Sequence, residues 1–301
     1  MDMTFDALKQ KMKTINAINI TPFDDQGRID WNDLRNNIDY LIRGGISMIY
    51  PCGNTGEFYS LTLQEAMEVT RKVVEYASGR ATIIAGIGYD VQTACEMAKH
   101  AEAVGADGVM IHQPINPYML NGGLLAYYQK IVRSTRLPVT LYVKSEQVGL
   151  DVLREISREP NVVGVKYAVN NLPLFAKTVK TVGNDIVWIC GTAEMWAPFF
   201  FAAGAEGFTS GMVNVDTGRS FAMLAALKAN RYAEAMDIWE DLRQFEELRE
   251  KNSNGNNVSV VKEAMRQLGM CSGKVRPPIT ELQPNEKEMV RQVLVKWGLL
   301  Q

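Results

Sequence analysis

A regular alternation of short apolar runs with longer amphipathic stretches constrains the fold more than any other feature. Eight apolar runs of strand length occur along the chain, and a segment with helical spacing of its apolar residues follows each of them. The runs span residues 15–23, 46–51, 81–87, 107–112, 138–144, 161–168, 185–190 and 206–210. Buried strands that alternate with helices form a parallel sheet, and eight such units close naturally into a barrel. We therefore predict an α/β protein with the (β/α)8 TIM-barrel fold.

The helical segments between the runs are marked by glycines at their ends. Residues 103–109 and 202–208 have nearly the same sequence, and each places a glycine between a predicted helix and the next strand. Glycine just past a helix end is a common cap. We interpret Gly105 and Gly204 as helix-ending glycines that recur with the repeating unit of the barrel, and not as parts of ligand-binding loops.

After Gly211 the pattern changes to helices alone. Helical spacing covers residues 216–229, 231–252, 257–269 and 284–298. The first of these segments completes the barrel as its eighth helix. We therefore predict a barrel of residues 1–230 and a C-terminal helical region of residues 231–301, packed on the barrel or on another subunit.

Composition narrows the classes of function. The chain of 301 residues is 47% hydrophobic and 22% charged, with a net charge of −2 and no basic run, so we expect neither a nucleic acid nor a membrane as partner. The N-terminal stretch Met1–Lys13 lacks the apolar core of a signal peptide. The four cysteines have neither metal nor redox spacing and are read as reduced thiols, which predicts a cytoplasmic protein.

The histidines bear on the question of a metal. The chain has two, His100 in a predicted helix and His112 in a predicted strand. A catalytic zinc usually takes about three protein ligands, commonly two or three of them histidines. We therefore expect no metal and no other cofactor, and carbonyl chemistry that runs through an amine.

Lys166 is the candidate amine. It lies inside the apolar run Asn161–Val169, where burial of an ammonium is costly and favours the neutral form. A neutral amine attacks a carbonyl carbon to form an imine. The alternative from this stretch alone is a lysine that reaches solvent at the strand end or pairs with a carboxylate.

Further polar residues gather at the predicted strand ends, where barrel enzymes carry their active sites. Gly53–Glu57 follows the second strand, and its glycines allow a tight turn whose N–H groups could face an anion. Tyr142 and Lys144 lie two residues apart on one face of the fifth strand, and Thr209 ends the eighth. Each of these features also has a purely structural interpretation: Gly53–Glu57 as a plain turn, Tyr142 as a core residue and Lys144 as a solvated lysine. Their joint placement at strand ends favours a functional site.

The chain resembles the dihydrodipicolinate synthase / N-acetylneuraminate lyase family in Gly53–Glu57, Tyr142, Gly164–Lys166 and Gly207–Val215, in order and spacing. The resemblance implies a barrel with a three-helix C-terminal region, assembled as a homotetramer (a dimer of dimers). It also implies a metal-independent lyase that forms an imine with pyruvate or another 2-oxo acid.

By the same resemblance, each site residue has an implied role. Lys166 is the imine lysine, and Tyr142 is the phenol that relays protons. Asn54 and Thr55 hold the carboxylate of the 2-oxo acid, and Thr209 contributes a backbone contact near it.

The chain also departs from the family. Asn54-Thr55 stands where the dihydrodipicolinate synthases have Thr-Thr and the neuraminate lyases Ser-Thr. Gln147 occupies the position of the arginine that binds the second substrate's carboxylate, and Ile115-Asn116 falls where a second relay tyrosine comes from a neighbouring subunit. Lys144 is particular to this sequence, and we expect it to hold the distal end of a longer substrate.

These departures favour a lyase, either aldolase or dehydratase, that acts on pyruvate or a longer and possibly sugar-derived 2-oxo acid. The alternatives are dihydrodipicolinate synthase itself and a non-catalytic barrel that binds 2-oxo acids. A nucleotide-dependent oxidoreductase is suggested only by Gly86-Ile87-Gly88, a motif that lacks its third glycine.

Overall fold

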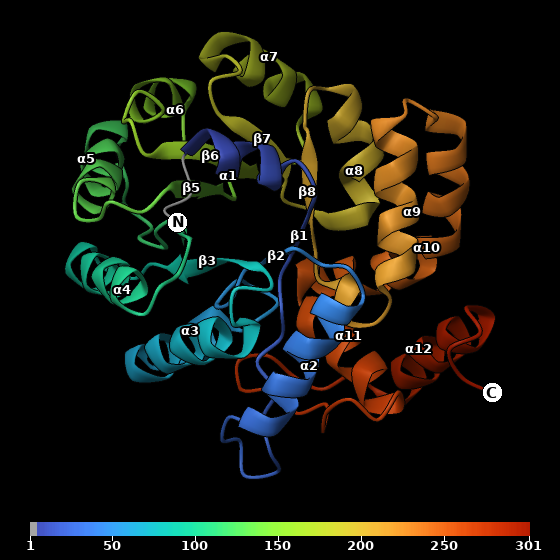
Figure 1. Ribbon diagram of the computed structural model, residues 1–301. Coiled ribbons are helices and arrows are strands. Elements are labelled where there is room, and N and C mark those ends of the chain that lie inside the picture. Colours follow the sequence, from blue (N-terminus) through green and yellow to red (C-terminus); the bar gives the residue numbers. More distant parts are fainter. Residues whose placement is uncertain (1–4) are drawn as a thin grey trace.

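The computed structural model describes residues 5–301, and these form a closed barrel of parallel strands surrounded by helices (Figure 1). Each strand pairs with its sequence neighbours, and β1 pairs with β8 to close the ring. The strands are β1 (Ile15–Ala17), β2 (Met48–Ile49), β3 (Thr82–Ile87), β4 (Gly108–Ile111), β5 (Val139–Val143), β6 (Val162–Tyr167), β7 (Val187–Cys190) and β8 (Gly207–Ser210). The predicted (β/α)8 fold is confirmed.

One helix follows each strand and packs on the outside of the barrel. These helices are α2 (Trp31–Arg43), α3 (Leu63–Ala77), α4 (Val91–Ala103), α5 (Asn121–Val132), α6 (Leu150–Ile156), α7 (Leu172–Val182), α8 (Ala193–Ala202) and α9 (Thr217–Lys228). Side chains fix several of their starts: Asp30 accepts hydrogen bonds from two N–H groups of α2, and Thr62 forms a capping box with Glu65 at α3. Gly105 and Gly204 have positive φ angles at the predicted helix ends.

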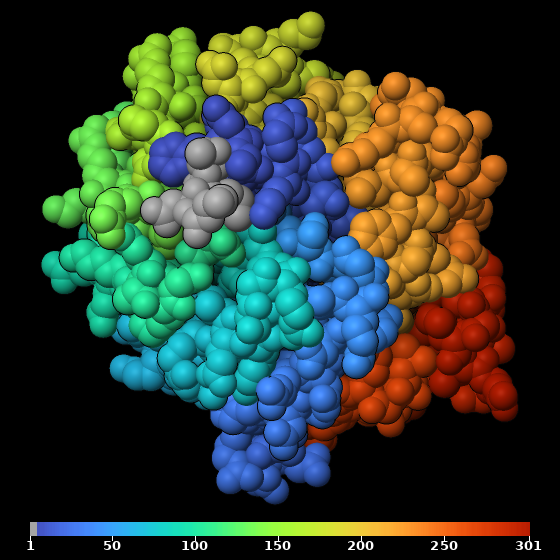
Figure 2. Space-filling model, viewed as in Figure 1, coloured from blue at the N-terminus to red at the C-terminus, as the bar shows by residue number. Residues whose placement is uncertain are grey.

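A short helix that has no counterpart among the predicted elements closes one end of the barrel. α1 (Phe5–Met12) precedes β1 and contacts β6 and β7. It lies across the end of the barrel that faces the viewer in Figure 1, over β6 and β7, and its dark blue atoms cover this part of the face in Figure 2. Leu8 and Met12 are fully buried, and Met12 reaches into the space beside Gly164, where a Cβ atom would lie 2.6 Å from its Cε. The amino ends of the strands are therefore sealed, and the opposite end is left for a site.

Three further helices complete the chain: α10 (Tyr232–Asn254), α11 (Asn257–Gln267) and α12 (Pro284–Lys296). α10 packs on α8 and α9, and α11 and α12 pack on α10 in turn, beside the barrel (Figure 1). The chain does not continue regularly from α10 to α11, because Asn252, Ser253 and Asn254 all have positive φ angles. The predicted C-terminal helical extension is thus present.

None of the helices within residues 5–301 is both long and apolar enough to cross a membrane. The prediction that Met1–Lys13 lacks a signal-peptide core concerns in part residues 1–4, which lie outside the described residues.

Candidate active site

A pocket of 670 Å³ opens at the carboxyl ends of the strands. Its wall contains every residue that the sequence singled out as a candidate: Asn54, Thr55, Tyr142, Lys144, Lys166 and Thr209. The fold brings these residues together because β2, β5, β6 and β8 end at the same rim of the barrel.

Lys166 lies near the end of β6 with only 3% of its surface exposed. Burial lowers the pKa of its ammonium to about 7, and the positive charge of Lys144 lowers that pKa further. No carboxylate in the described part of the chain pairs with Lys166 to offset this cost. The alternative readings of Lys166, a solvent-exposed or ion-paired lysine, are therefore wrong, and a large fraction of the amine is neutral near pH 7.

Tyr142 of β5 lies beside this amine. The Nζ atom of Lys166 is 4.0 Å from the centre of the Tyr142 ring, and the Nδ2 of Asn54 donates a hydrogen bond of 3.1 Å to the Tyr142 phenol. Burial raises the pKa of Tyr142, so its phenol is protonated at neutral pH. The pair thus places a neutral nucleophile next to a proton donor whose orientation Asn54 sets.

His112 packs behind Tyr142, a neighbour that the sequence did not assign to the site. The centres of the two rings are 5.6 Å apart, and the Nε2 of His112 lies 2.8 Å from the carbonyl oxygen of Cys52. Burial lowers the pKa of His112 to about 3. The His112 imidazole is therefore neutral, and its ring packs against the Tyr142 ring without lining the pocket.

The loop after β2 is shaped differently from the prediction. Its left-handed residues are Cys52 and Glu57, whereas Gly53 and Gly56 have ordinary φ angles. A Cβ atom on Gly53 would lie 2.5 Å from the Ile18 side chain, so that glycine serves close packing against the chain after β1. The tight turn itself comes from non-glycine residues, and the glycines let the loop approach the barrel.

A buried ion pair anchors this loop to the C-terminal helices. The carboxylate of Glu57 pairs with the Lys262 ammonium of α11, and neither side chain is exposed. The backbone N–H of Arg276 donates a hydrogen bond of 3.1 Å to the other oxygen of Glu57. The helical region thus holds the residues that precede Glu57 in the pocket wall.

Lys144 lies directly after β5, where Gln113 accepts a hydrogen bond of 2.7 Å from its backbone N–H. Its side chain is exposed, and its Nζ is 5.7 Å from the centre of the Tyr59 ring and 6.0 Å from that of Tyr142. Partial burial against this wall lowers the pKa of Lys144. Lys144 and Tyr142 therefore face the same pocket, with the lysine on the solvent side.

Thr209, by contrast, is buried in β8. Its hydroxyl donates a hydrogen bond of 3.3 Å to the carbonyl oxygen of Cys190.

Part of the pocket wall comes from residues that the sequence did not identify as functional. They lie in α10, in α11 and in the segment before α12: Glu246, Arg249, Glu250, Ser253, Asn254, Asn257, Val258, Pro278 and Ile279. The run of asparagines before α11 indicated a helix break, but a break does not reveal that it faces the barrel. The packing of the whole C-terminal region around the barrel rim brings these residues to the site.

The glycine pair at Gly86 and Gly88 does not form a nucleotide-binding loop. Gly86 is part of β3, where a Cβ atom would lie 2.2 Å from the carbonyl oxygen of Cys52. The glycine permits close contact between neighbouring strand ends, and the reading as a nucleotide-dependent oxidoreductase is wrong.

Known proteins share this architecture over nearly the whole chain. The sequence profile of the dihydrodipicolinate synthetase family matches residues 11–296. The 4-hydroxy-tetrahydrodipicolinate synthase of Methanoculleus marisnigri is 33% identical over 287 residues, which cover 93% of this chain and 97% of that protein. A Rhodococcus opacus protein named as a probable 5-dehydro-4-deoxyglucarate dehydratase is 30% identical over 282 residues, with 92% of both chains covered.

A solved structure agrees with these relatives. The crystal structure of dihydrodipicolinate synthase from Oceanobacillus iheyensis matches with a TM-score of 0.96 and 44% sequence identity, over 98% of this chain and 100% of that one. The chain belongs to the dihydrodipicolinate synthetase family and is a Schiff-base lyase of that family.

Proposed function

We propose that the protein acts on a 2-oxo acid through an imine at Lys166. The observation that carries this proposal is a buried lysine with a pKa of about 7 beside a protonated phenol in the family's barrel pocket. The neutral amine attacks the keto carbon to give a carbinolamine, and loss of its hydroxyl as water leaves a protonated imine. That cation withdraws electrons from the neighbouring carbon, so that an aldol bond can break there, or a proton can leave before a hydroxyl group departs.

Tyr142 is the general acid and base of this proposal. Its phenol donates a proton to the departing carbinolamine hydroxyl and takes protons back at later steps. The hydrogen bond from Asn54 supports this role because it holds the phenol oxygen in one orientation. Thr55, Asn54 and the backbone at Thr209 are proposed to bind the carboxylate of the 2-oxo acid.

Lys144 is proposed to bind the far end of the substrate. Gln147, which stands at the family's arginine position, is exposed and does not line the pocket, whereas Lys144 does. A lysine offers a single point charge where arginine offers a planar fork, so the preferred substrate should differ from that of the synthases. We therefore favour a longer, hydroxylated 2-oxo acid with a second carboxylate, such as the sugar-derived diacid named for the Rhodococcus relative, and its dehydration or aldol cleavage.

A turnover panel tests this proposal. The purified protein is incubated with 5-dehydro-4-deoxyglucarate, with hydroxylated 2-oxo acids that lack the second carboxylate, and with pyruvate plus aspartate semialdehyde, and products are followed by NMR and mass spectrometry. We expect turnover of the diacid and little condensation with the semialdehyde. Efficient condensation would identify a dihydrodipicolinate synthase instead, and imine formation without any product would identify a non-catalytic binder.

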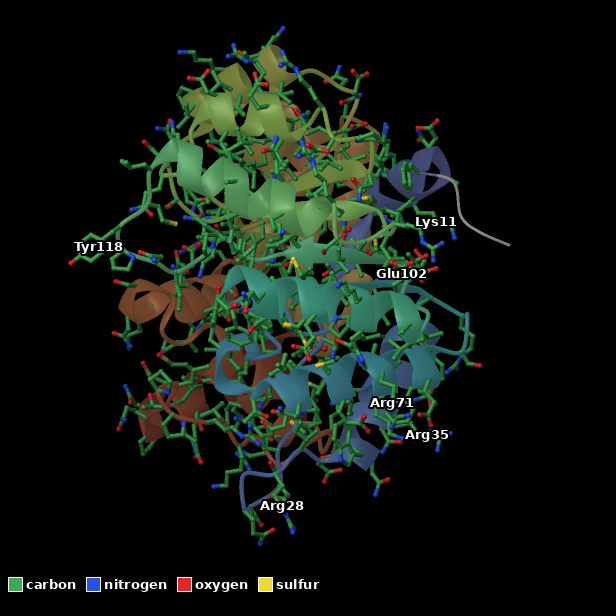
Figure 3. All side chains as sticks on the ribbon, turned by 90° about the vertical axis from the view of Figure 1, so that its left-hand side faces the viewer. Lys11, Arg28, Arg35, Arg71, Glu102 and Tyr118 are labelled. Atoms are coloured by element: carbon green, nitrogen blue, oxygen red, sulfur yellow. The ribbon has the colours of Figure 1, made fainter. Side chains whose placement is uncertain are left out.

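We also propose a homotetramer, built as a dimer of dimers. The segment after β4 supports this assembly because Ile115, Tyr118 and Leu120 are 71%, 92% and 83% exposed. Figure 3 shows Tyr118 extending from the surface at the end of the molecule opposite Lys11. Light scattering of the wild type and of Tyr118→Glu/Leu120→Glu would test it; a wild-type monomer would refute the assembly.

The cytoplasm is the proposed location, and the four free thiols support it. Cell fractionation of the tagged full chain would test this assignment.

A further inference from the structure

Arg249 is an arginine of α10 that lines the pocket, although only 2% of its surface is exposed. Its Nη1 donates a hydrogen bond of 2.6 Å to Glu246, which is equally buried. Its Nη2 makes one further, longer hydrogen bond of 3.3 Å to Asn257. A guanidinium carries five N–H donors, so part of its hydrogen-bonding capacity remains unused. The Nε of Arg249 has no hydrogen-bond partner in the described part of the chain.

The guanidinium and the Thr55 hydroxyl converge on one point at the end of β8. A Cβ atom on Gly211 would lie 2.9 Å from the Nη2 of Arg249 and 3.0 Å from the Oγ1 of Thr55. Any side chain at position 211 would therefore displace one of these groups. Gly211 leaves the guanidinium room to reach the part of the pocket where Thr55 lies.

Asn257 links the same two groups. Its Oδ1 accepts a hydrogen bond of 3.3 Å from the Nη2 of Arg249 and one of 3.5 Å from the Oγ1 of Thr55. Both contacts are long for hydrogen bonds, so a stronger acceptor placed between the donors would compete for them. A carboxylate is such an acceptor.

Two buried carboxyl groups lie near Arg249, and their protonation decides how much negative charge surrounds its guanidinium. Glu246 is the direct partner of Arg249, while the buried Glu194 behind it bonds to the Ser220 hydroxyl. Burial, and next the negative charge of Glu246, raise the pKa of Glu194 to about 7. Glu194 is thus substantially protonated near neutral pH, and Arg249 is not shared between two full negative charges.

We propose that Arg249 binds the carboxylate of the 2-oxo acid together with Thr55, an inference that rests on the proposed function. The C-terminal helical region then supplies a cation inside the pocket, distinct from Lys144 at its mouth. Arg249 selects for an ionised acid at the end of the substrate next to the imine carbon, and Gly211 is the residue that makes room for it.

The test compares a charged ligand with a neutral one. Wild-type protein and variants are treated with borohydride at increasing concentrations of pyruvate or of methyl pyruvate, and the label on Lys166 is measured by mass spectrometry. Arg249→Met alone would leave the Glu246 charge buried and unpaired, so the main variant is Arg249→Met/Glu246→Gln. Gly211→Ala is the second variant, because it keeps the ion pair and only crowds the guanidinium.

We expect both variants to raise the pyruvate concentration for half-maximal labelling, the double variant by roughly 10- to 100-fold, the range for hydrogen bonds to a charged group. The value for methyl pyruvate should stay nearly the same. An equal loss for both ligands would show a merely structural arginine, and no change in either would equally overturn the inference.

A second measurement separates this inference from the proposed function. At one fixed pyruvate concentration, the melting temperature of the wild type should rise more than that of the variants, because the variants bind pyruvate more weakly. If the wild type forms no label but pyruvate still stabilises it, the imine proposal fails. The Arg249 assignment is then decided by whether pyruvate stabilises the variants less than the wild type. If pyruvate neither labels nor stabilises the wild type, both fail.

Discussion

The Nζ atom of Lys166 lies 4.0 Å from the centre of the Tyr142 ring, and both residues face the same pocket. An amine kept neutral by burial needs a proton donor nearby if a carbinolamine is to lose its hydroxyl as water. β5 and β6 are paired with Tyr142 opposite Lys166, so the sheet register itself sets this spacing.

Replacement of Tyr142 by phenylalanine should lower turnover by roughly 10²- to 10⁴-fold, because it removes one general acid–base group. Steady-state assays with the substrate found in the turnover panel measure this. Tyr128→Phe is the matched control, since the Tyr128 phenol is buried in α5 without a hydrogen-bond partner in the described part of the chain. A Tyr142→Phe rate close to that of the wild type would remove Tyr142 from the chemistry.

Imine formation should depend on pH through the pKa of Lys166, which burial lowers to about 7. Only the deprotonated amine attacks, so labelling should rise about tenfold per pH unit below that value and level off above it. Lys144→Met removes a like charge and should raise the pKa of Lys166, shifting the profile to higher pH, whereas Lys144→Arg should leave it in place. A profile that Lys144→Met does not move would contradict this coupling.

Lys144→Met should also change substrate preference. The variant loses the charge at the pocket mouth, so processing of a diacid or sugar-acid substrate should fall far more than labelling with plain pyruvate. Parallel measurements of kcat/KM for the diacid and of pyruvate labelling above pH 9 check this. Equal effects on both, or no effect on either, would mean that Lys144 does not bind the distal end of the substrate.

Removal of the buried Lys262 ammonium should destabilise the fold. Lys262→Met leaves the Glu57 carboxylate buried without its partner, and such a loss costs about 3–5 kcal/mol of unfolding free energy. Urea unfolding measures the change. Lys274→Met is the control, because its pair with Glu281 is over 40% exposed on both sides and should contribute less than about 1 kcal/mol. Similar small losses in both variants would show that the Glu57–Lys262 pair does not anchor the loop.

The barrel and the grouping of the candidate residues in one pocket could be predicted because their signals are local. Most strands are apolar runs, several helix ends carry a glycine or a capping side chain, and Lys166 stands out as a charge inside such a run. Strand ends of a barrel share one rim, so the candidate residues could be grouped without any knowledge of contacts. The division at residue 230 stays a prediction.

The rest could not be predicted because it depends on contacts between distant segments. Arg249 looks like an ordinary charge in an amphipathic helix until α10 packs on the barrel and Gly211 leaves it room. α1 could not be predicted either, since its eight residues include three charged side chains and give little helical periodicity. From the sequence, the glycines beside Asn54 are expected to allow a tight turn. In the structure, glycine is required there because the loop packs closely against the chain after β1.

The site of covalent labelling is the most direct test of imine formation at Lys166. The wild-type protein is treated with pyruvate and borohydride, digested, and its peptides are analysed by mass spectrometry, with Lys166→Arg as the control. We expect the mass of the reduced pyruvate adduct on the peptide containing Lys166, and its loss in Lys166→Arg. A label on Lys144, or no label on the wild type at pH 8 with saturating pyruvate, would contradict it.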